Sequence, residues 1–151
     1  MSTLTQKVVR RFLAATLPPV TVFHGTDAGL LSQIRSKGLI SPVGYDSPAW
    51  FMVAEDITSA AFHTVADDDR QPIVIEYKVP TEPKVREDGT KRIMWPGYPY
   101  LWKPEHKTWG GKSTNWYALR QPLPASFIKA IHRLSKEQWQ KYRDESQEPK
   151  G

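Results

Sequence analysis

The run from Pro72 to Pro80 constrains the fold of this chain more than any other feature. Between its two prolines it reads Ile73-Val74-Ile75-Glu76-Tyr77-Lys78-Val79, rich in β-branched and aromatic residues. Its first three positions are uniformly apolar, which is typical of a strand in the interior of a sheet. The sequence therefore predicts a sheet in which this segment is a central strand.

Shorter patterns predict the elements around that strand. Val20 to Phe23 reads as a strand that ends at His24-Gly25-Thr26. A helix should follow, capped by Asp27 and ended by Gly38, with Leu30, Leu31 and Ile34 at helical spacing. The segment 49–53 should be a strand, and 57–65 a helix capped by Glu55-Asp56. Strand character returns at 116–119 and an apolar run at 126–132, before a capping box, Ser135-Lys136-Glu137-Gln138, that begins a last helix.

Length and composition fit one domain. The chain has 151 residues, 39% of them hydrophobic and 25% charged. We divide it into an N-terminal helical extension (1–19), a main domain (20–134) and a C-terminal helix with a tail (135–151) that becomes disordered after Asp144. No apolar stretch reaches the length of a membrane span, and cysteine is absent. We therefore expect a soluble, cytoplasmic monomer without membrane contact.

The segment 81–115 differs from the rest of the chain. It contains five tryptophan and tyrosine residues, seven lysines and arginines, and the pair Gly110-Gly111. Such a stretch is too long for a simple connection, so we interpret it as a functional excursion. We expect it to face a macromolecular acceptor, either a protein or a nucleic acid.

Three separated segments resemble the catalytic domain of ADP-ribosyltransferases of the His-Gly-Thr type and, more distantly, RNA 2′-phosphotransferases. They are Phe23-His24-Gly25-Thr26 with the helix after it, the aromatic strand 49–53 with its alanine-containing helix, and the central strand 72–80. The resemblance covers residues 20–80 well and 112–131 loosely. It implies an α+β fold, a split and mostly antiparallel sheet with flanking helices, and an enzyme that consumes NAD as a substrate.

The same resemblance assigns roles to individual residues. His24 would contact the adenosine ribose, since a neutral imidazole both donates and accepts hydrogen bonds. Gly25 would let the backbone approach the nicotinamide, Thr26 would add a hydroxyl, and Trp50 or Phe51 would stack on the nicotinamide ring. Since the four histidines are far apart and no carboxylate cluster accompanies them, we expect no metal.

The chain departs from the family at the third motif. Many relatives place a glutamate near the start of a late strand, where it stabilises the oxocarbenium-like transition state. The matching segment 113–120 contains no acid, and Asn115 lies nearest the expected position. We therefore take His24 and Asn115 as the catalytic candidates, and we predict transfer of single ADP-ribose units rather than polymer formation.

Three other functions stay open. A two-histidine phosphoesterase would use the motifs His24/Thr26 and His106/Thr108, with one histidine as base and the other as acid, although the surroundings of His106 are poor for a strand. An RNA 2′-phosphotransferase would use the basic second half of the chain. A catalytically degenerate module would bind ADP-ribose, another nucleotide or nucleic acid without turnover.

Overall fold

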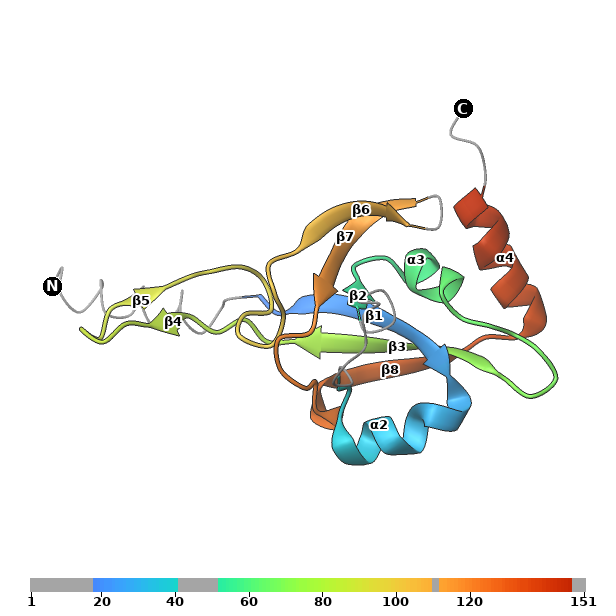
Figure 1. The fold of residues 1–151 in the computed structure, drawn as a ribbon, viewed down its shortest axis with the longest axis horizontal. Helices are drawn as coiled ribbons and strands as arrows, with labels where there is room; N and C mark the ends of the chain where they lie inside the picture. Colours follow the sequence, from blue (N-terminus) through green and yellow to red (C-terminus); the bar gives the residue numbers. More distant parts are fainter. Residues whose placement is uncertain (1–17, 41–51, 110–111, 148–151) are drawn as a thin grey trace, which may run out of the picture.

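The computed structural model describes residues 18–40, 52–109 and 112–147, and within them it has an α+β fold. Its centre is a six-stranded antiparallel sheet with the strand order β6-β7-β2-β1-β3-β8 (Figure 1). The strands are β1 (Val20–Asp27), β2 (Met52–Ala54), β3 (Pro72–Val79), β6 (Glu105–Trp109), β7 (Lys112–Ala118) and β8 (Ile128–Arg133). None of the helices in these described ranges is long and apolar enough to cross a membrane.

The predicted central strand is confirmed. β3 pairs with β1 on one side, from Val20↔Val79 to Asp27↔Pro72, and with β8 on the other. The first four residues of β3 are buried, as the apolar run predicts. The sheet is far less continuous between β1 and β2, where the described residues pair only at Phe23↔Ala54.

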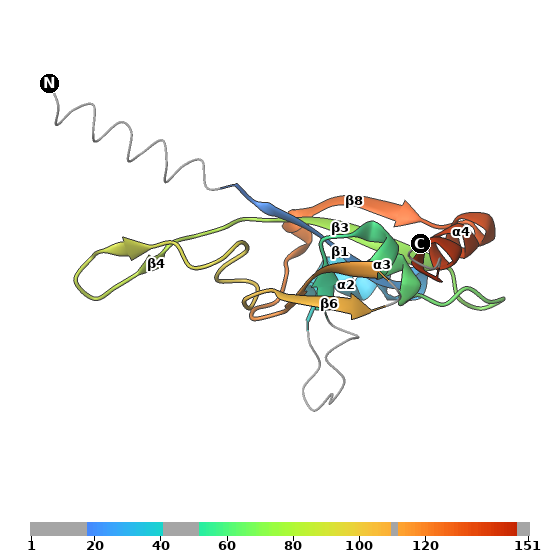
Figure 2. The ribbon, with the colours of Figure 1, turned by 90° about the horizontal axis from the view of Figure 1, so that it is seen from above.

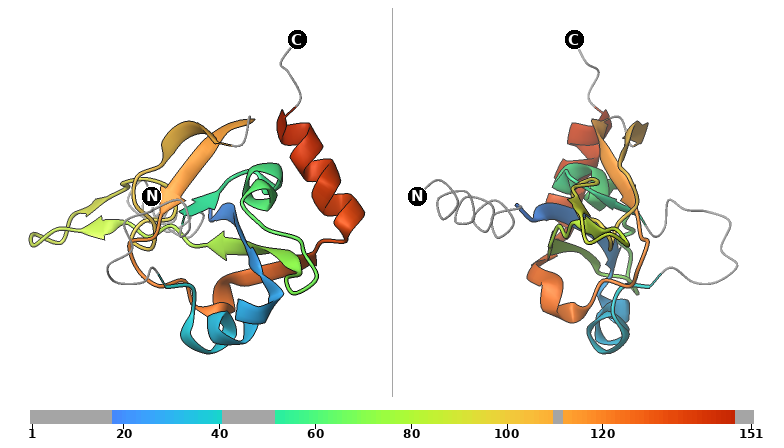
Figure 3. Two further views of the ribbon diagram at one scale, coloured as in Figure 1. Left: turned by 45° about the vertical axis from the view of Figure 1, so that its right-hand side comes forward. Right: turned by 90° about the vertical axis from the view of Figure 1, so that its left-hand side faces the viewer.

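Helices cover both faces of the sheet. The helix α2 (Leu31–Lys37), preceded by the short helix η1 (Ala28–Leu30), packs on the face that carries Val22 and Ile75. The helices α3 (Ile57–Phe62) and α4 (Lys136–Gln147) pack on the opposite face, around Val74. Figures 1 and 3 show α2 on one side of the sheet and α3 with α4 on the other.

Side-chain caps begin the helices as the sequence predicts. Asp27 accepts a hydrogen bond from the Gly29 N–H at 3.1 Å, and Asp56 accepts one from the Thr58 N–H at 3.4 Å. Ser135 and Gln138 form the reciprocal capping box, with bonds of 3.1 and 3.2 Å. At the other end of α2, Gly38 has φ 81° and ψ 171°, a positive-φ conformation that favours glycine, and its N–H bonds to the Ile34 carbonyl.

Several expected boundaries were wrong, including those of β2, which ends at Ala54, and of β7, which begins at Lys112. β1 does not end at Phe23 but continues through His24, Gly25 and Thr26, because each of these residues pairs with β3. The helix expected at 57–65 ends at Phe62, and α4 continues past Asp144 to Gln147. The run at 126–132 begins with a short helix, η3 (Ala125–Phe127), before β8.

The segment 81–115 is not one excursion. Its second part forms β6 and the start of β7, which belong to the main sheet. Only its first part leaves the body, as a two-stranded hairpin of β4 (Lys84–Val85) and β5 (Lys91–Arg92). Figure 2 shows this hairpin extending away from the sheet. The expected helix at 1–19 lies almost wholly outside the described residues.

Candidate functional site

The His-Gly-Thr segment lies inside β1, and strand alternation separates its side chains. His24 and Thr26 point to the face that α2 covers, whereas Gly25 points toward α3. A Cβ atom on Gly25 would lie 2.1 Å from the Ala60 carbonyl oxygen and 2.8 Å from the Thr64 Cγ2. The close approach of α3 to β1 therefore requires a glycine here, independently of any ligand.

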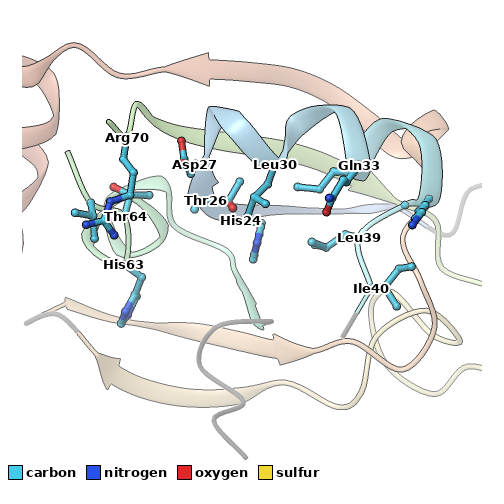
Figure 4. Close-up of a pocket in the computed structure, with 15 residues that line it drawn as sticks. His24, Thr26, Asp27, Leu30, Gln33, Leu39, Ile40, His63, Thr64 and Arg70 are labelled. Carbon is cyan, nitrogen blue, oxygen red and sulfur yellow. The ribbon is translucent and has the colours of Figure 1, made fainter. Parts of the chain in front are cut away.

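A cavity of about 570 Å³ opens beside this segment. Its walls come from the end of β1, from α2 with the residues after it, and from the segments that follow α3 (Figure 4). The described lining residues are His24, Gly25, Thr26, Asp27, Leu30, Gln33, Ile34, Lys37, Gly38, Leu39, Ile40, His63, Thr64, Val65 and Arg70. The volume lies in the range of small-molecule and cofactor sites.

His24 is held neutral in the wall of this cavity. Its side chain is 5% exposed, and burial lowers its pKa to about 4. Its Nδ1 lies 3.3 Å from the Met52 carbonyl oxygen, which can only accept a hydrogen bond. Nδ1 therefore carries the proton and Nε2 is left as an acceptor, ready for a ligand hydroxyl.

Two cations and a second imidazole complete the lining. Lys37 comes from the last turn of α2, and Arg70 comes from the loop before β3, where it pairs with Asp67 at 2.7 Å. His63 ends α3, and burial, aided by the Arg143 charge, lowers its pKa. Figure 4 shows His24 and His63 extending from different elements toward the same side of the cavity.

The helix α4 supports the wall that carries His63. Trp139 Nε1 donates to the Thr64 carbonyl oxygen at 3.3 Å, and Arg143 Nη1 donates to that of Phe62 at 3.0 Å. The Arg143 guanidinium also lies 4.7 Å from the Phe62 ring centroid and 4.9 Å from that of Trp139. The C-terminal helix thus positions the segment after α3 from behind.

A hydrogen-bonded polar chain lies on the strands across from β1. His106 Nδ1 lies 3.1 Å from Asn115 Oδ1, and Asn115 Nδ2 donates to Glu55 Oε2 at 3.1 Å. The Tyr117 hydroxyl donates to the other carboxylate oxygen of Glu55. Burial and the Glu55 carboxylate raise the pKa of Tyr117, so its hydroxyl stays protonated and Glu55 receives two donors.

Strand register relates this polar chain to His24. Phe23 pairs with Ala54, so their side chains share one face of the sheet. The residues that follow them, His24 and Glu55, therefore share the other face. Strand spacing and rise put their Cα atoms on the order of 10 Å apart. Glu55 is absent from the cavity lining, and so is Asn115.

The predicted site residues therefore divide into three groups. His24, Gly25 and Thr26 line one cavity. Asn115 lies on β7, two strands from β1, and contacts Glu55. Trp50 and Phe51 lie outside the described residues.

Sequence patterns did not single out Glu55, His63, Lys37 or Arg70. Glu55 looked like part of a helix cap, and only the pairing of β2 with β7 brings its carboxylate to Asn115. His63 and Arg70 belong to a helix end and a loop, whose positions depend on packing. The basic residue in the last turn of α2 was the one signal available for Lys37.

The expectation about His106 needs a correction. His106 lies within the strand β6, paired with Asn115, and not in an irregular loop. Three strand spacings, about 14 Å, separate β6 from β1 in the sheet. The two His-x-Thr segments therefore lie on strands that are not neighbours in the sheet.

In the ranges that the structure covers, no group of three histidine, aspartate or glutamate side chains is arranged to hold a metal ion.

No protein-family model, no curated protein and no solved structure matches this chain.

Proposed function

We propose that the chain is an NAD-dependent mono-ADP-ribosyltransferase whose NAD binds in the His24 cavity. The observation that carries this proposal is the state of His24: buried, neutral, and held by the Met52 carbonyl with Nε2 available. A neutral acceptor in the wall of a cofactor-sized cavity suits a ribose hydroxyl better than a phosphate, which would favour a charged partner.

The other lining residues suit the remaining parts of NAD. Lys37 and Arg70 provide positive charge for the diphosphate. Apart from His24, His63 is the only ring among the described lining residues, so it is our candidate for contact with the nicotinamide face. Trp50 and Phe51 stay predictions for the same role. The Thr26 hydroxyl, which has no hydrogen-bond partner within the described ranges, would serve a further ligand oxygen.

Glu55 supplies the negative charge that the third motif lacks. In this reaction the bond between nicotinamide and ribose C1′ breaks, its electron pair leaves with nicotinamide, and positive charge develops on the ribose. A carboxylate facing that charge lowers the barrier. Glu55 is exposed, lies on the same sheet face as His24, and is oriented by Asn115 and Tyr117. We therefore propose Glu55 as the stabilising group and Asn115 as its positioning residue; an acceptor nucleophile then bonds to C1′ and loses a proton.

The test is incubation with NAD labelled in its adenylate part, together with a cell extract as the source of acceptor. We expect nicotinamide release and transfer of the label. His24→Ala should weaken NAD binding, whereas Glu55→Gln should bind NAD and lose at least tenfold in turnover. Glu145→Gln, an equivalent change at an exposed position of α4, is the control and should behave as the wild type.

The outcomes separate the alternatives. NAD or ADP-ribose binding without nicotinamide release would mean a degenerate binding module. Cleavage of a phosphodiester that disappears in His106→Ala would favour the phosphoesterase, and NAD-dependent removal of an RNA 2′-phosphate would favour the phosphotransferase. The separation of β6 from β1 supports the transferase over the phosphoesterase.

A further inference from the structure

The hairpin of β4 and β5 forms an arm, which we define as residues 82–98. Its strands pair at Lys84↔Arg92 and Val85↔Lys91, and the Arg86 N–H donates to the Thr90 carbonyl at 2.8 Å to close the turn. Figures 1 and 2 show the arm pointing away from the body, at the end opposite α4. A short ribbon of this kind contributes little to a hydrophobic core, so its sequence is free to serve contact with a partner.

The arm carries four cations and three acids, a net charge of +1. Lys84, Arg86, Lys91 and Arg92 are all exposed, and none forms an ion pair within the described part of the chain. The acids of the arm are Glu82, Glu87 and Asp88, and the last is engaged by the Thr90 backbone and hydroxyl at 2.9 and 2.6 Å. The cations are therefore available to an external polyanion.

An aromatic stack stands at the base of the arm. The Arg120 guanidinium lies 5.1 Å from the Tyr98 ring centroid and 5.2 Å from that of Trp102. Arg120 Nη1 also donates to the Pro99 carbonyl oxygen at 3.3 Å, which fixes the guanidinium. The Trp102 side chain is nevertheless 50% exposed, a large apolar surface for a tryptophan outside a core.

From this juxtaposition we infer that the arm and Trp102 bind a single-stranded nucleic acid. Cations along a ribbon attract phosphates, and an exposed indole beside them offers a platform on which an unpaired base stacks. An acidic protein would bind the cations, but it would not require an exposed indole beside them. A duplex hides its bases from such a ring, so the stack favours an unpaired strand.

Backbone pairing relates the Trp102 surface to the strand that carries His24. The backbone N–H of Trp102 donates to the Ala118 carbonyl at 2.9 Å, and Ala118 pairs with Met52. The Met52 carbonyl in turn lies 3.3 Å from the His24 Nδ1. Three strand spacings, about 14 Å, therefore separate the backbone of Trp102 from that of His24. The Trp102 side chain shares a face of the sheet with Ala118 and Met52, whereas His24 points to the opposite face, which carries the cavity. The inference is therefore of binding at the arm, and it does not depend on the proposed function.

The experiment is fluorescence anisotropy of labelled oligo(dT) and oligo(U), titrated with the full chain in the absence of NAD. Trp102→Ala should weaken binding about tenfold, and Trp102→Phe should restore most of it. Lys84→Ser with Arg92→Ser should weaken binding and reduce the slope of log affinity against log salt by about 1.4. The control Lys136→Ser with Lys141→Ser removes two exposed cations from α4 at the opposite end and should leave affinity nearly unchanged.

Several results would overturn the inference. These are equal binding of polyglutamate, tighter binding of a duplex than of either single strand, or equal losses in the arm and α4 variants. A preference for either oligo(dT) or oligo(U) over a duplex would support it. Because Trp102 is half exposed, thermal unfolding should show all variants folded. If the chain binds single strands but does not turn over NAD, the proposed transferase function is refuted and the inference of nucleic-acid binding stands.

Discussion

Acidification tests directly whether the fold keeps His24 uncharged. The imidazole has a pKa of 6.5 in the unfolded chain and about 4 in the folded one, because burial penalises its charged form. Between these values the unfolded state binds a proton that the folded state does not, so the free energy of unfolding falls as the pH falls. The loss is about 1.4 kcal/mol per pH unit, or about 3 kcal/mol between pH 6.5 and 4, and the contribution of His24 levels off below pH 4.

The assay is equilibrium unfolding by urea at a series of pH values, on the wild type and on His24→Asn. Titrations elsewhere in the chain occur in both proteins and cancel in the difference between their unfolding free energies. We expect the wild type to lose about 3 kcal/mol relative to His24→Asn as the pH falls from 6.5 to 4. Gln33→Ala, on the same cavity wall, removes no titrating group and should follow the wild type at every pH.

A difference between wild type and His24→Asn that stays constant within 1 kcal/mol from pH 7 to pH 4 would refute the reasoning. It would mean that His24 is solvated or paired with an anion in solution. The proposed hydrogen bond from a ribose hydroxyl to a neutral Nε2 would then lose its basis.

Three further predictions concern stability. Gly25→Ala should cost about 2 kcal/mol or more, because its Cβ would meet a backbone carbonyl of α3, whereas Gly29→Ala, with no atom nearer than 3.6 Å, should change the melting temperature little. The hydrogen bond from His132 lowers the pKa of Glu76, so Glu76→Gln should destabilise the chain by about 1 kcal/mol at pH 7. The difference should shrink as acid protonates the wild-type carboxylate. An equal difference in unfolding free energy between wild type and variant at pH 7 and pH 3, measured in urea, would contradict this. Trp139→Ala should lower the free energy of unfolding in urea by about 2 kcal/mol and weaken the proposed NAD binding, since it removes the support behind the cavity wall; an unchanged affinity for NAD would show that α4 does not support the site.

Local signals predicted the elements but misplaced some of their ends. The caps at Asp27, Asp56 and Ser135 act through atoms two or three residues away, so they are visible in the sequence. The extension of β1 through Gly25 is not visible in the sequence, because glycine is typical of a strand break. Only pairing with β3 makes this segment part of the strand. In the same way, β6 emerged from a segment without a strand pattern because β7 pairs with it.

The sequence by itself determined that this chain builds an α+β domain around a buried central strand, with His24-Gly25-Thr26 beside it. Apolar runs and caps are short-range properties, and they act wherever the chain goes. Tertiary structure alone decided that His24 is buried and neutral, that His63 and Arg70 share its cavity, and that Glu55 reaches Asn115. Those facts depend on strand register and on desolvation, which arise only when segments distant in the sequence come into contact.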